Sequence, residues 1–228
     1  MTSIASRITA DAVQEPSQAP RIVPEPATVR PSPTIAQAES RSVASLSHYP
    51  KLAYPHIRLN GPVDLGMYNS FRSVMNNPPA DEIVIALTTL GGDPEVARVM
   101  GEDIRLFGEQ TGQNALFLGK VAVYSAGATF MSYFRRENRF LTHGTRILIH
   151  ERQLHKTVEL GGPLRACADQ LRATLNEIEE SIRIEEEGFA NLVVQSNIPI
   201  EDVLLKAPHN WYIDAEEAMR LGLVLDVI

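Results

Sequence analysis

Ser125 interrupts an otherwise apolar run, VAVYSAGATFM, at residues 121–131. Two interpretations are open for this serine. In the first, it caps a helix that begins there, because a serine oxygen accepts a hydrogen bond from a free N–H group of the first turn. In the second, it is a nucleophile held where a strand ends and a helix begins, with its hydroxyl at the positive end of the helix dipole.

Two further features lie at the ends of predicted strands. Gly91 and Gly92 follow the apolar run 82–89, and His150 closes the run 145–150. Open parallel sheets place their sites at the carboxyl ends of their strands. Each feature also has a purely structural interpretation, since a glycine pair often forms a tight turn and such a histidine is often a satisfied buried residue. Taken singly, none of the three identifies a site.

The elements that must position these residues alternate between strands and helices. The predicted strands are 57–60, 82–89, 114–124 and 145–150, and helices are predicted at 63–75, from 94 onward and at 125–134. A short helix at 215–222 and a last strand at 223–228 close the chain. Strand, turn and helix thus recur three times, which predicts an α/β domain built on a mostly parallel sheet.

One long helix is predicted over 164–196. Its apolar positions form a heptad-like seam, and its other faces are rich in glutamate; the seam consists of Leu171, Leu175, Ile178, Ile182, Phe189 and Leu192. A long helix with a narrow apolar seam usually packs against another helix. Since the sequence predicts no second long helix, a partner subunit is the natural candidate.

Composition narrows the class of protein. The 228 residues are 44% apolar and carry a net charge of −7, without any block of lysine or arginine, so we expect no nucleic-acid partner. Cys167 is the only cysteine, which excludes an intrachain disulfide and a cysteine-based metal site and suits a reducing compartment. The apolar runs are too short to cross a bilayer. We therefore expect a cytoplasmic protein with no membrane contact.

Residues 1–50 differ from the rest of the chain. They contain seven of the fifteen prolines and no glycine, and their four arginines are matched by four acidic residues. Such a segment buries too little apolar surface to offset its ordering entropy, so we expect a disordered tail followed by one domain at 51–228. Transit peptides are poor in acidic residues, and a cleaved targeting peptide is weakly supported.

The segment from His56 to the C-terminus resembles the ClpP family of serine peptidases, the proteolytic subunit of ATP-dependent Clp protease. The matching stretches, in family order, are TTLGGDPEVARVMGEDIR (88–105), VAVYSAGATFM (121–131), RILIHERQ (146–153) and WYIDAEEAMRLGLVLDVI (211–228). His150 follows Ser125 by 25 positions, which equals the family spacing. The resemblance implies a ClpP/crotonase-like fold, a repeated β-β-α superhelix with a mostly parallel sheet and a protruding handle helix.

The resemblance also implies roles for single residues. Ser125 would attack a peptide carbonyl, and His150 would take its proton and deliver it to the leaving amine. The main-chain N–H groups of Gly92 and Ala126 would form the oxyanion hole. No cofactor and no metal are implied, and the expected activity is that of a serine-type endopeptidase acting on unfolded proteins or peptides.

The third triad position departs from the family. Asn210 stands where the family has aspartate, and an asparagine holds a histidine by a hydrogen bond without stabilising imidazolium by charge. We therefore expect reduced activity. Asp214 is near in sequence and could substitute for the missing aspartate only if its loop were rearranged.

The expected partners follow the family in part. A ring assembly through the handle helix is implied, although the stretch between His150 and Asn210 is longer than usual. Family members begin with an axial loop and a helix that help to engage a Clp-type AAA+ ATPase. Here SHYPKLAYPH (47–56) resembles nothing comparable, so docking to such an ATPase is an open question.

Other functions remain open beside the peptidase. The chain could be a catalytically weak or inactive structural subunit of a ring, with Asn210 as the mark of lost chemistry. A phage-type prohead peptidase is a variant of the first hypothesis. A crotonase-type acyl-CoA enzyme shares the fold, but it would not need Ser125 and His150 at the family spacing.

Overall fold

The computed structural model describes residues 48–78 and 82–228. Most of the predicted tail, residues 1–47, therefore lies outside the described residues. The helices and 3-10 turns are η1 (Pro50–Ala53), α2 (Leu65–Met75), α3 (Pro94–Thr111), α4 (Ala126–Ser132), η2 (Arg136–Asn138), α5 (Leu164–Val193), α6 (Ile200–Lys206), η3 (Ala207–His209) and α7 (Ala215–Arg220). The strands are β1 (Ile57–Asn60), β2 (Glu82–Thr89), β3 (Asn114–Tyr124), β4 (Arg139–Leu141), β5 (Arg146–Ile149), β6 (Trp211–Asp214) and β7 (Asp226–Val227).

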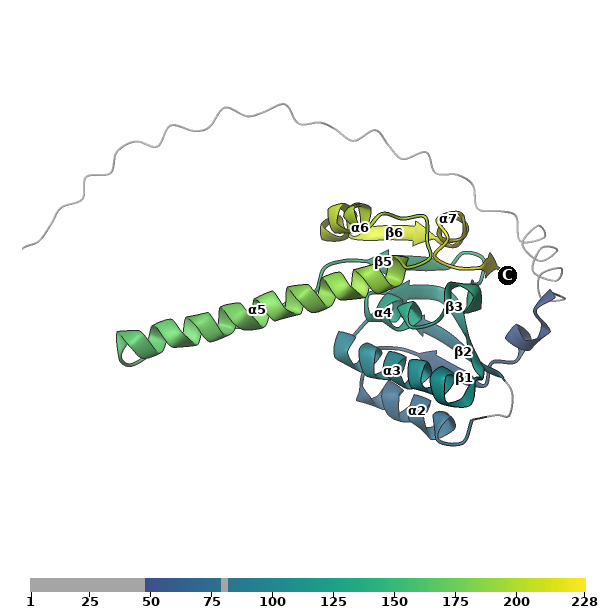
Figure 1. The fold of residues 1–228 in the computed structure, drawn as a ribbon, viewed down its shortest axis with the longest axis horizontal. Coiled ribbons are helices and arrows are strands. Elements are labelled where there is room, and N and C mark those ends of the chain that lie inside the picture. The colour runs from purple at the N-terminus through teal and green to yellow at the C-terminus, as the bar shows by residue number, and fades with distance from the viewer. Residues whose placement is uncertain (1–47, 79–81) are drawn as a thin grey trace, which may run out of the picture. The chain divides into compact units, whose positions relative to one another are not determined.

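The strands of the described part form one mostly parallel sheet. Its main order is β1-β2-β3-β4-β7, and all four of these pairings are parallel (Figure 1). The long strand β3 changes partner along its length, because residues 117–119 pair with β4 and residues 122–124 pair with β5. Among the strands of residues 48–78 and 82–228, only β6 runs antiparallel, and it pairs with β5. The predicted α/β class with a mostly parallel sheet is confirmed.

The main core lies between the sheet and the helices α2, α3 and α4. Strand β2 is buried on both faces over most of its length, as its apolar sequence EIVIALTT requires of a strand inside a parallel sheet. A cluster of aromatic rings in edge-to-face and tilted contacts joins the helices to β3; it consists of Phe71, Phe130, Phe117 and Phe134. A smaller cluster on the other side of the sheet holds Leu52 of η1 against Val84 and Phe140. Tyr49 also packs on Phe140, so the ordered domain includes the last residues of the predicted tail.

Helix α5 is 30 residues long and extends well past the ends of the strands (Figure 1). Its buried residues are Phe189 and Leu192, near its C-terminal end. The remaining seam positions are largely exposed; the exposed fractions are 48% for Leu171, 54% for Leu175, 37% for Ile178 and 48% for Ile182. The helix is thus anchored at one end and presents an apolar stripe along the rest. Among the described residues, no helix is long and apolar enough to span a membrane.

Val121 adopts an unusual backbone conformation in the middle of β3. Its φ is 63°, in the left-handed region, and its side chain is 67% exposed. It lies where β3 passes from β4 to β5, and its N–H donates to Thr145 Oγ1 at 3.1 Å. A β-branched residue is strained in this region because its Cβ substituents crowd the backbone, at a cost of roughly 1–2 kcal/mol.

We expect Val121→Gly to raise the free energy of unfolding by about 0.5–1 kcal/mol. Glycine removes the strain, and its greater entropy in the unfolded chain offsets about half of that gain. Urea denaturation followed by circular dichroism measures the change. Val123→Gly is the matched control, because Val123 is fully buried on the same strand and its truncation should destabilise the protein. A loss of stability in Val121→Gly would contradict the interpretation.

Candidate active site

Ser125 occupies the single residue between β3 and α4. Its φ of 53° and ψ of −114° turn the chain sharply from strand to helix, and its N–H donates to Leu148 O at 2.9 Å. It stands at the N-cap position, yet its side chain makes no capping hydrogen bond. The capping interpretation is therefore wrong for the hydroxyl group. Strained backbone of this kind concentrates at functional sites.

Close packing explains the glycine that follows. A Cβ on Gly127 would lie 2.5 Å from Thr89 Cγ2, so only glycine lets α4 rest directly on the end of β2. Ala126 is also fully buried. The small residues after Ser125 thus allow α4 to pack closely on the sheet, and this packing fixes the position of the serine.

The Gly91–Gly92 turn lies against Ser125. Both glycines have positive φ, and a Cβ on Gly91 would stand 3.0 Å from Ser125 Cβ. A Cβ on Gly92 would stand 2.4 Å from Val63 O, because Val63 and Gly92 form a β-bridge. The Thr89 hydroxyl fixes the turn from inside by accepting from Gly91 N–H at 3.0 Å and donating to Gly91 O at 3.1 Å. This turn accepts glycine alone.

The main-chain N–H groups of Gly92 and Ala126 donate no hydrogen bond within the described part of the chain. Ala126 is the first residue of α4, whose opening N–H groups have no partner in the helix. Two unpaired donors beside a serine are what an oxyanion hole requires.

His150 follows directly after β5 and is half-buried. Its Nδ1 donates to the main-chain carbonyl of Glu151 at 2.6 Å. With Nδ1 protonated, Nε2 carries a lone pair that can accept a proton. The structure shows no hydrogen bond between Nε2 and the Ser125 hydroxyl.

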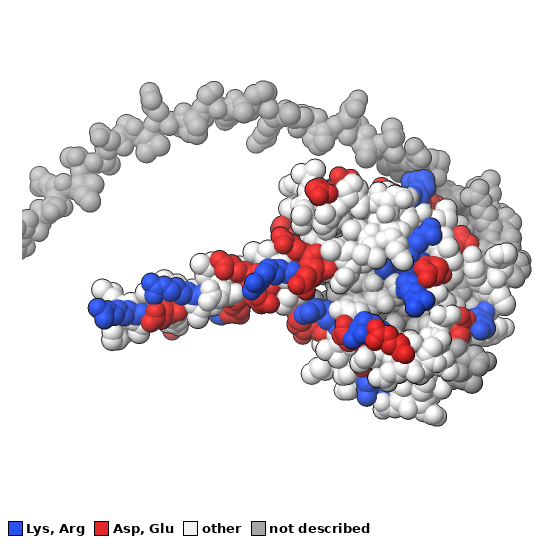
Figure 2. Space-filling model, in the orientation of Figure 1, with Lys and Arg blue, Asp and Glu red and all other residues white. Residues whose placement is uncertain are grey.

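These residues line one cleft of about 730 Å³. Gly92, Ser125, Ala126 and His150 all border it, although they come from three separate loops and a helix start. The opposite wall is the C-terminal half of α5, where acidic side chains gather as Figure 2 shows. The structure thus brings four of the five predicted site residues to a single cavity.

Asn210 is the exception. It does not border the cleft, it is exposed, and it has a left-handed φ of 58° as the C-cap of η3. The register of β5 with β6, continued by one residue beyond Ile149 and Trp211, would set Asn210 opposite His150. Its side chain makes no hydrogen bond within the described part, so its role stays a prediction. Asp214 is occupied as the cap of α7, since it accepts from Glu217 N–H at 2.8 Å.

A network of charged residues, which the sequence did not single out, lies beside His150. Arg152 and Arg98 both bind Glu95, each with an N–O distance of 2.7 Å. Burial raises the pKa of Glu95, but the hydrogen bonds and charges of these two arginines outweigh it and hold the pKa below its usual value. Glu185 on α5 accepts from the main-chain N–H of Arg152. Burial raises the pKa of Glu185 above its usual value.

Comparison with known proteins identifies the fold. No protein-family model and no curated protein sequence matches the chain. Among solved structures, the chain is similar to ClpP1 from Listeria monocytogenes, in a variant with one asparagine replaced by aspartate. The identity is 19% and the TM-score 0.56, over 75% of this chain and 90% of that chain. The fold is therefore ClpP-like, with a mostly parallel sheet and a long helix.

Proposed function

We propose that this chain is a serine endopeptidase that cleaves peptide bonds of unfolded proteins or peptides. The observation that carries the proposal is the shared cleft, bordered by Ser125, His150 and the unpaired N–H groups of Gly92 and Ala126. A hydroxyl, an imidazole and two main-chain donors in one cavity make up the apparatus for acyl transfer.

The chemistry follows from these groups. Ser125 Oγ attacks the carbonyl carbon of the substrate while His150 Nε2 takes the hydroxyl proton, and the oxyanion accepts hydrogen bonds from Gly92 and Ala126. The C–N bond then breaks as His150 gives its proton to the leaving amine. Water, activated by the same imidazole, hydrolyses the acyl-enzyme and restores the serine. The structure shows no hydrogen bond between Nε2 and Oγ, so a side-chain rotation must first bring these two atoms together.

We also propose that the chain self-associates into rings through α5. The ClpP-like fold and the exposed apolar stripe of α5 support this assembly. A Clp-type AAA+ ATPase is a further proposed partner, and the fold alone supports it.

A non-catalytic ring subunit is the second candidate function. The asparagine at position 210 favours it, as does the lack of a hydrogen bond between the side chains of Ser125 and His150. Such a subunit would assemble without turning over substrate.

Labelling with a fluorophosphonate separates the two candidates. This reagent forms a covalent bond with a serine hydroxyl only where a base activates it. We expect wild-type protein to be labelled, and Ser125→Ala to remain unlabelled, after size-exclusion chromatography has separated assembled from unassembled protein. Absence of labelling in every fraction would establish the non-catalytic alternative. Equal labelling of Ser125→Ala would place the nucleophile elsewhere.

A further inference from the structure

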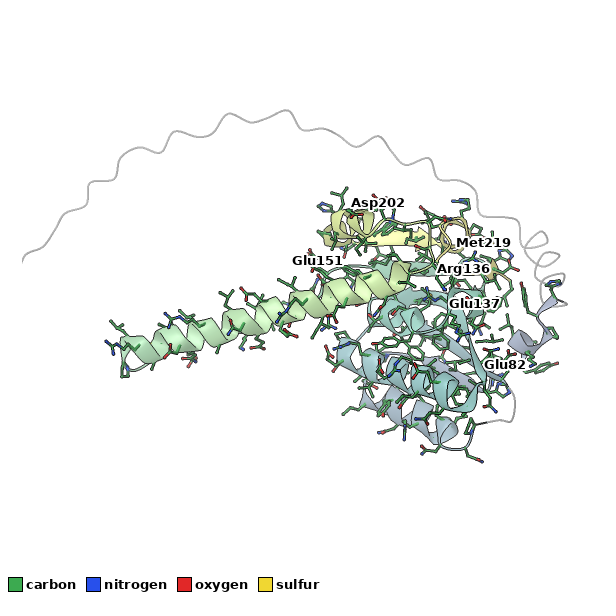
Figure 3. All side chains as sticks on the ribbon, in the orientation of Figure 1. Glu82, Arg136, Glu137, Glu151, Asp202 and Met219 are labelled. Carbon is green, nitrogen blue, oxygen red and sulfur yellow. The ribbon has the colours of Figure 1, made fainter. Side chains whose placement is uncertain are left out.

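One peptide group connects His150 to a carboxylate on α5. The carbonyl of Glu151 accepts from His150 Nδ1 at 2.6 Å. The N–H of the same peptide group, which belongs to Arg152, donates to Glu185 Oε2. Imidazole, peptide group and carboxylate thus form one chain of hydrogen bonds. Figure 3 shows Glu151 beside the C-terminal half of α5, where this chain lies.

We propose that Glu185 is a positioning residue for His150 and acts through the peptide group between residues 151 and 152. This inference rests on the proposed peptidase function. The peptide carbonyl would select the Nδ1-protonated imidazole, and Glu185 would supply the negative charge that Asn210 lacks. The third member of the catalytic group would then be a main-chain carbonyl backed by a carboxylate.

Hydrogen bonds in series strengthen one another. A carboxylate that accepts from a peptide N–H polarises the peptide group and makes its carbonyl oxygen more negative. The oxygen therefore becomes a better hydrogen-bond acceptor. The oxygen stabilises the imidazolium that forms when His150 takes the serine proton. The effect is weaker than that of a carboxylate bound directly to the imidazole, because the charge lies one peptide group away.

The surrounding contacts hold this peptide group in place. The Arg152 side chain binds Glu95 at the start of α3, and Lys156 binds Glu177 on α5. The segment after His150 is therefore fastened on both sides. Asn210 has no comparable support, because it is exposed and makes no side-chain hydrogen bond among the described residues.

The proposed role of Glu185 predicts that activity falls toward acidic pH. Burial raises the pKa of Glu185, with the negative charges of Glu151 and Glu186 adding to it and the N–H and guanidinium of Arg152 opposing it. When the pH falls below this pKa, the Glu185 carboxylate is protonated and loses the negative charge that polarises the peptide group. Activity should therefore fall as the pH drops through the raised pKa, earlier than an ordinary glutamate would allow.

The test compares Glu185→Gln with wild type on a short fluorogenic peptide across pH. We expect kcat at the plateau to fall by about tenfold, well short of the ~10⁴-fold loss known for a direct triad aspartate. We also expect the acidic limb of the profile to move to lower pH, which a merely structural loss would not produce. Glu179→Gln, an exposed glutamate on the same helix, should leave both unchanged. Asn210→Ala should change kcat by less than about threefold, since a group outside the chain of hydrogen bonds adds little.

A second measurement does not depend on turnover. Nitrogen-15 NMR of His150 should show the Nδ1-protonated tautomer in wild type and a mixture of tautomers in Glu185→Gln. An unshifted acidic limb in Glu185→Gln, or a larger loss in Asn210→Ala, would overturn the inference while fluorophosphonate labelling kept the peptidase function intact. An Nε2-protonated imidazole in wild type would overturn it as well. Failure of labelling with the expected tautomers would instead overturn the peptidase function, and Glu185 would then hold the imidazole of a non-catalytic subunit.

Discussion

Ser125→Ala and His150→Ala should each lower kcat by about 10⁶-fold, and the double variant should be no slower than either single one. The reason is that nucleophile and base act as one unit. Without the imidazole the hydroxyl keeps its proton, and without the hydroxyl the imidazole has no group to activate. Residual turnover would come from the N–H groups of Gly92 and Ala126 and from substrate binding alone.

Hydrolysis of a fluorogenic peptide is measured under single-turnover and steady-state conditions. The four proteins compared are wild type, Ser125→Ala, His150→Ala and the double variant. Ser181→Ala is the matched control, since Ser181 also borders the cleft and its hydroxyl donates to Glu177 O within its own helix. It should retain wild-type kcat. Losses that add up in the double variant would mean that Ser125 and His150 act separately, and the shared cleft would then have no catalytic meaning.

The buried strands were the most predictable part of the fold. Strands β1, β2 and β3 begin and end at the predicted residues. Strand β1 alternates apolar and polar residues, and β2 and β3 are mostly apolar, which leaves few alternatives to a strand. The predicted helix at 164–196 corresponds to α5, three residues shorter at its end. Strand β4 and helix α6 were not predicted. Strand β4 has three residues and is held by pairing with β3 and with β7 at the end of the chain. Helix α6 has only seven residues, too few for a clear helical pattern.

The site residues at the ends of strands could be predicted from the sequence, whereas the contacts that surround them could not. Ser125, His150 and the glycine turn follow from the rule that parallel strands direct their carboxyl ends to one edge. The hydrogen bond from the Arg152 main-chain N–H to Glu185 joins residues 33 positions apart. Because its donor is a main-chain group, no pattern of side chains in the sequence predicts it. The positive φ of Val121 was equally hidden, since valine favours extended strands.

Arg139→Met should lower the free energy of unfolding by about 3 kcal/mol, because four buried carbonyls would lose their donor. Arg139 is 2% exposed, and the sequence around it, RRENRF, resembles a surface turn. Its guanidinium donates to four main-chain oxygens; the distances are 2.8 Å to Phe134, 2.9 Å to Ser132 and 3.2 Å to both Leu192 and Leu223. One side chain thereby joins the end of α4, the end of α5 and the segment before β7.

Two opposing terms set the size of this effect. Burial lowers the pKa of Arg139 to about 10, with the charge of Glu137 opposing it, so the buried cation is itself unfavourable. Methionine would relieve that cost and fill much of the volume, while each carbonyl left without a donor costs roughly 1–3 kcal/mol. The cost of leaving four carbonyls without a donor is larger than the gain from removing the buried cation. Urea denaturation of Arg139→Met beside the exposed Arg135→Met, where the change should stay within about 0.5 kcal/mol, measures the difference. Equal stability of the two variants would show that the ends of α4 and α5 are held by apolar packing and not by this guanidinium.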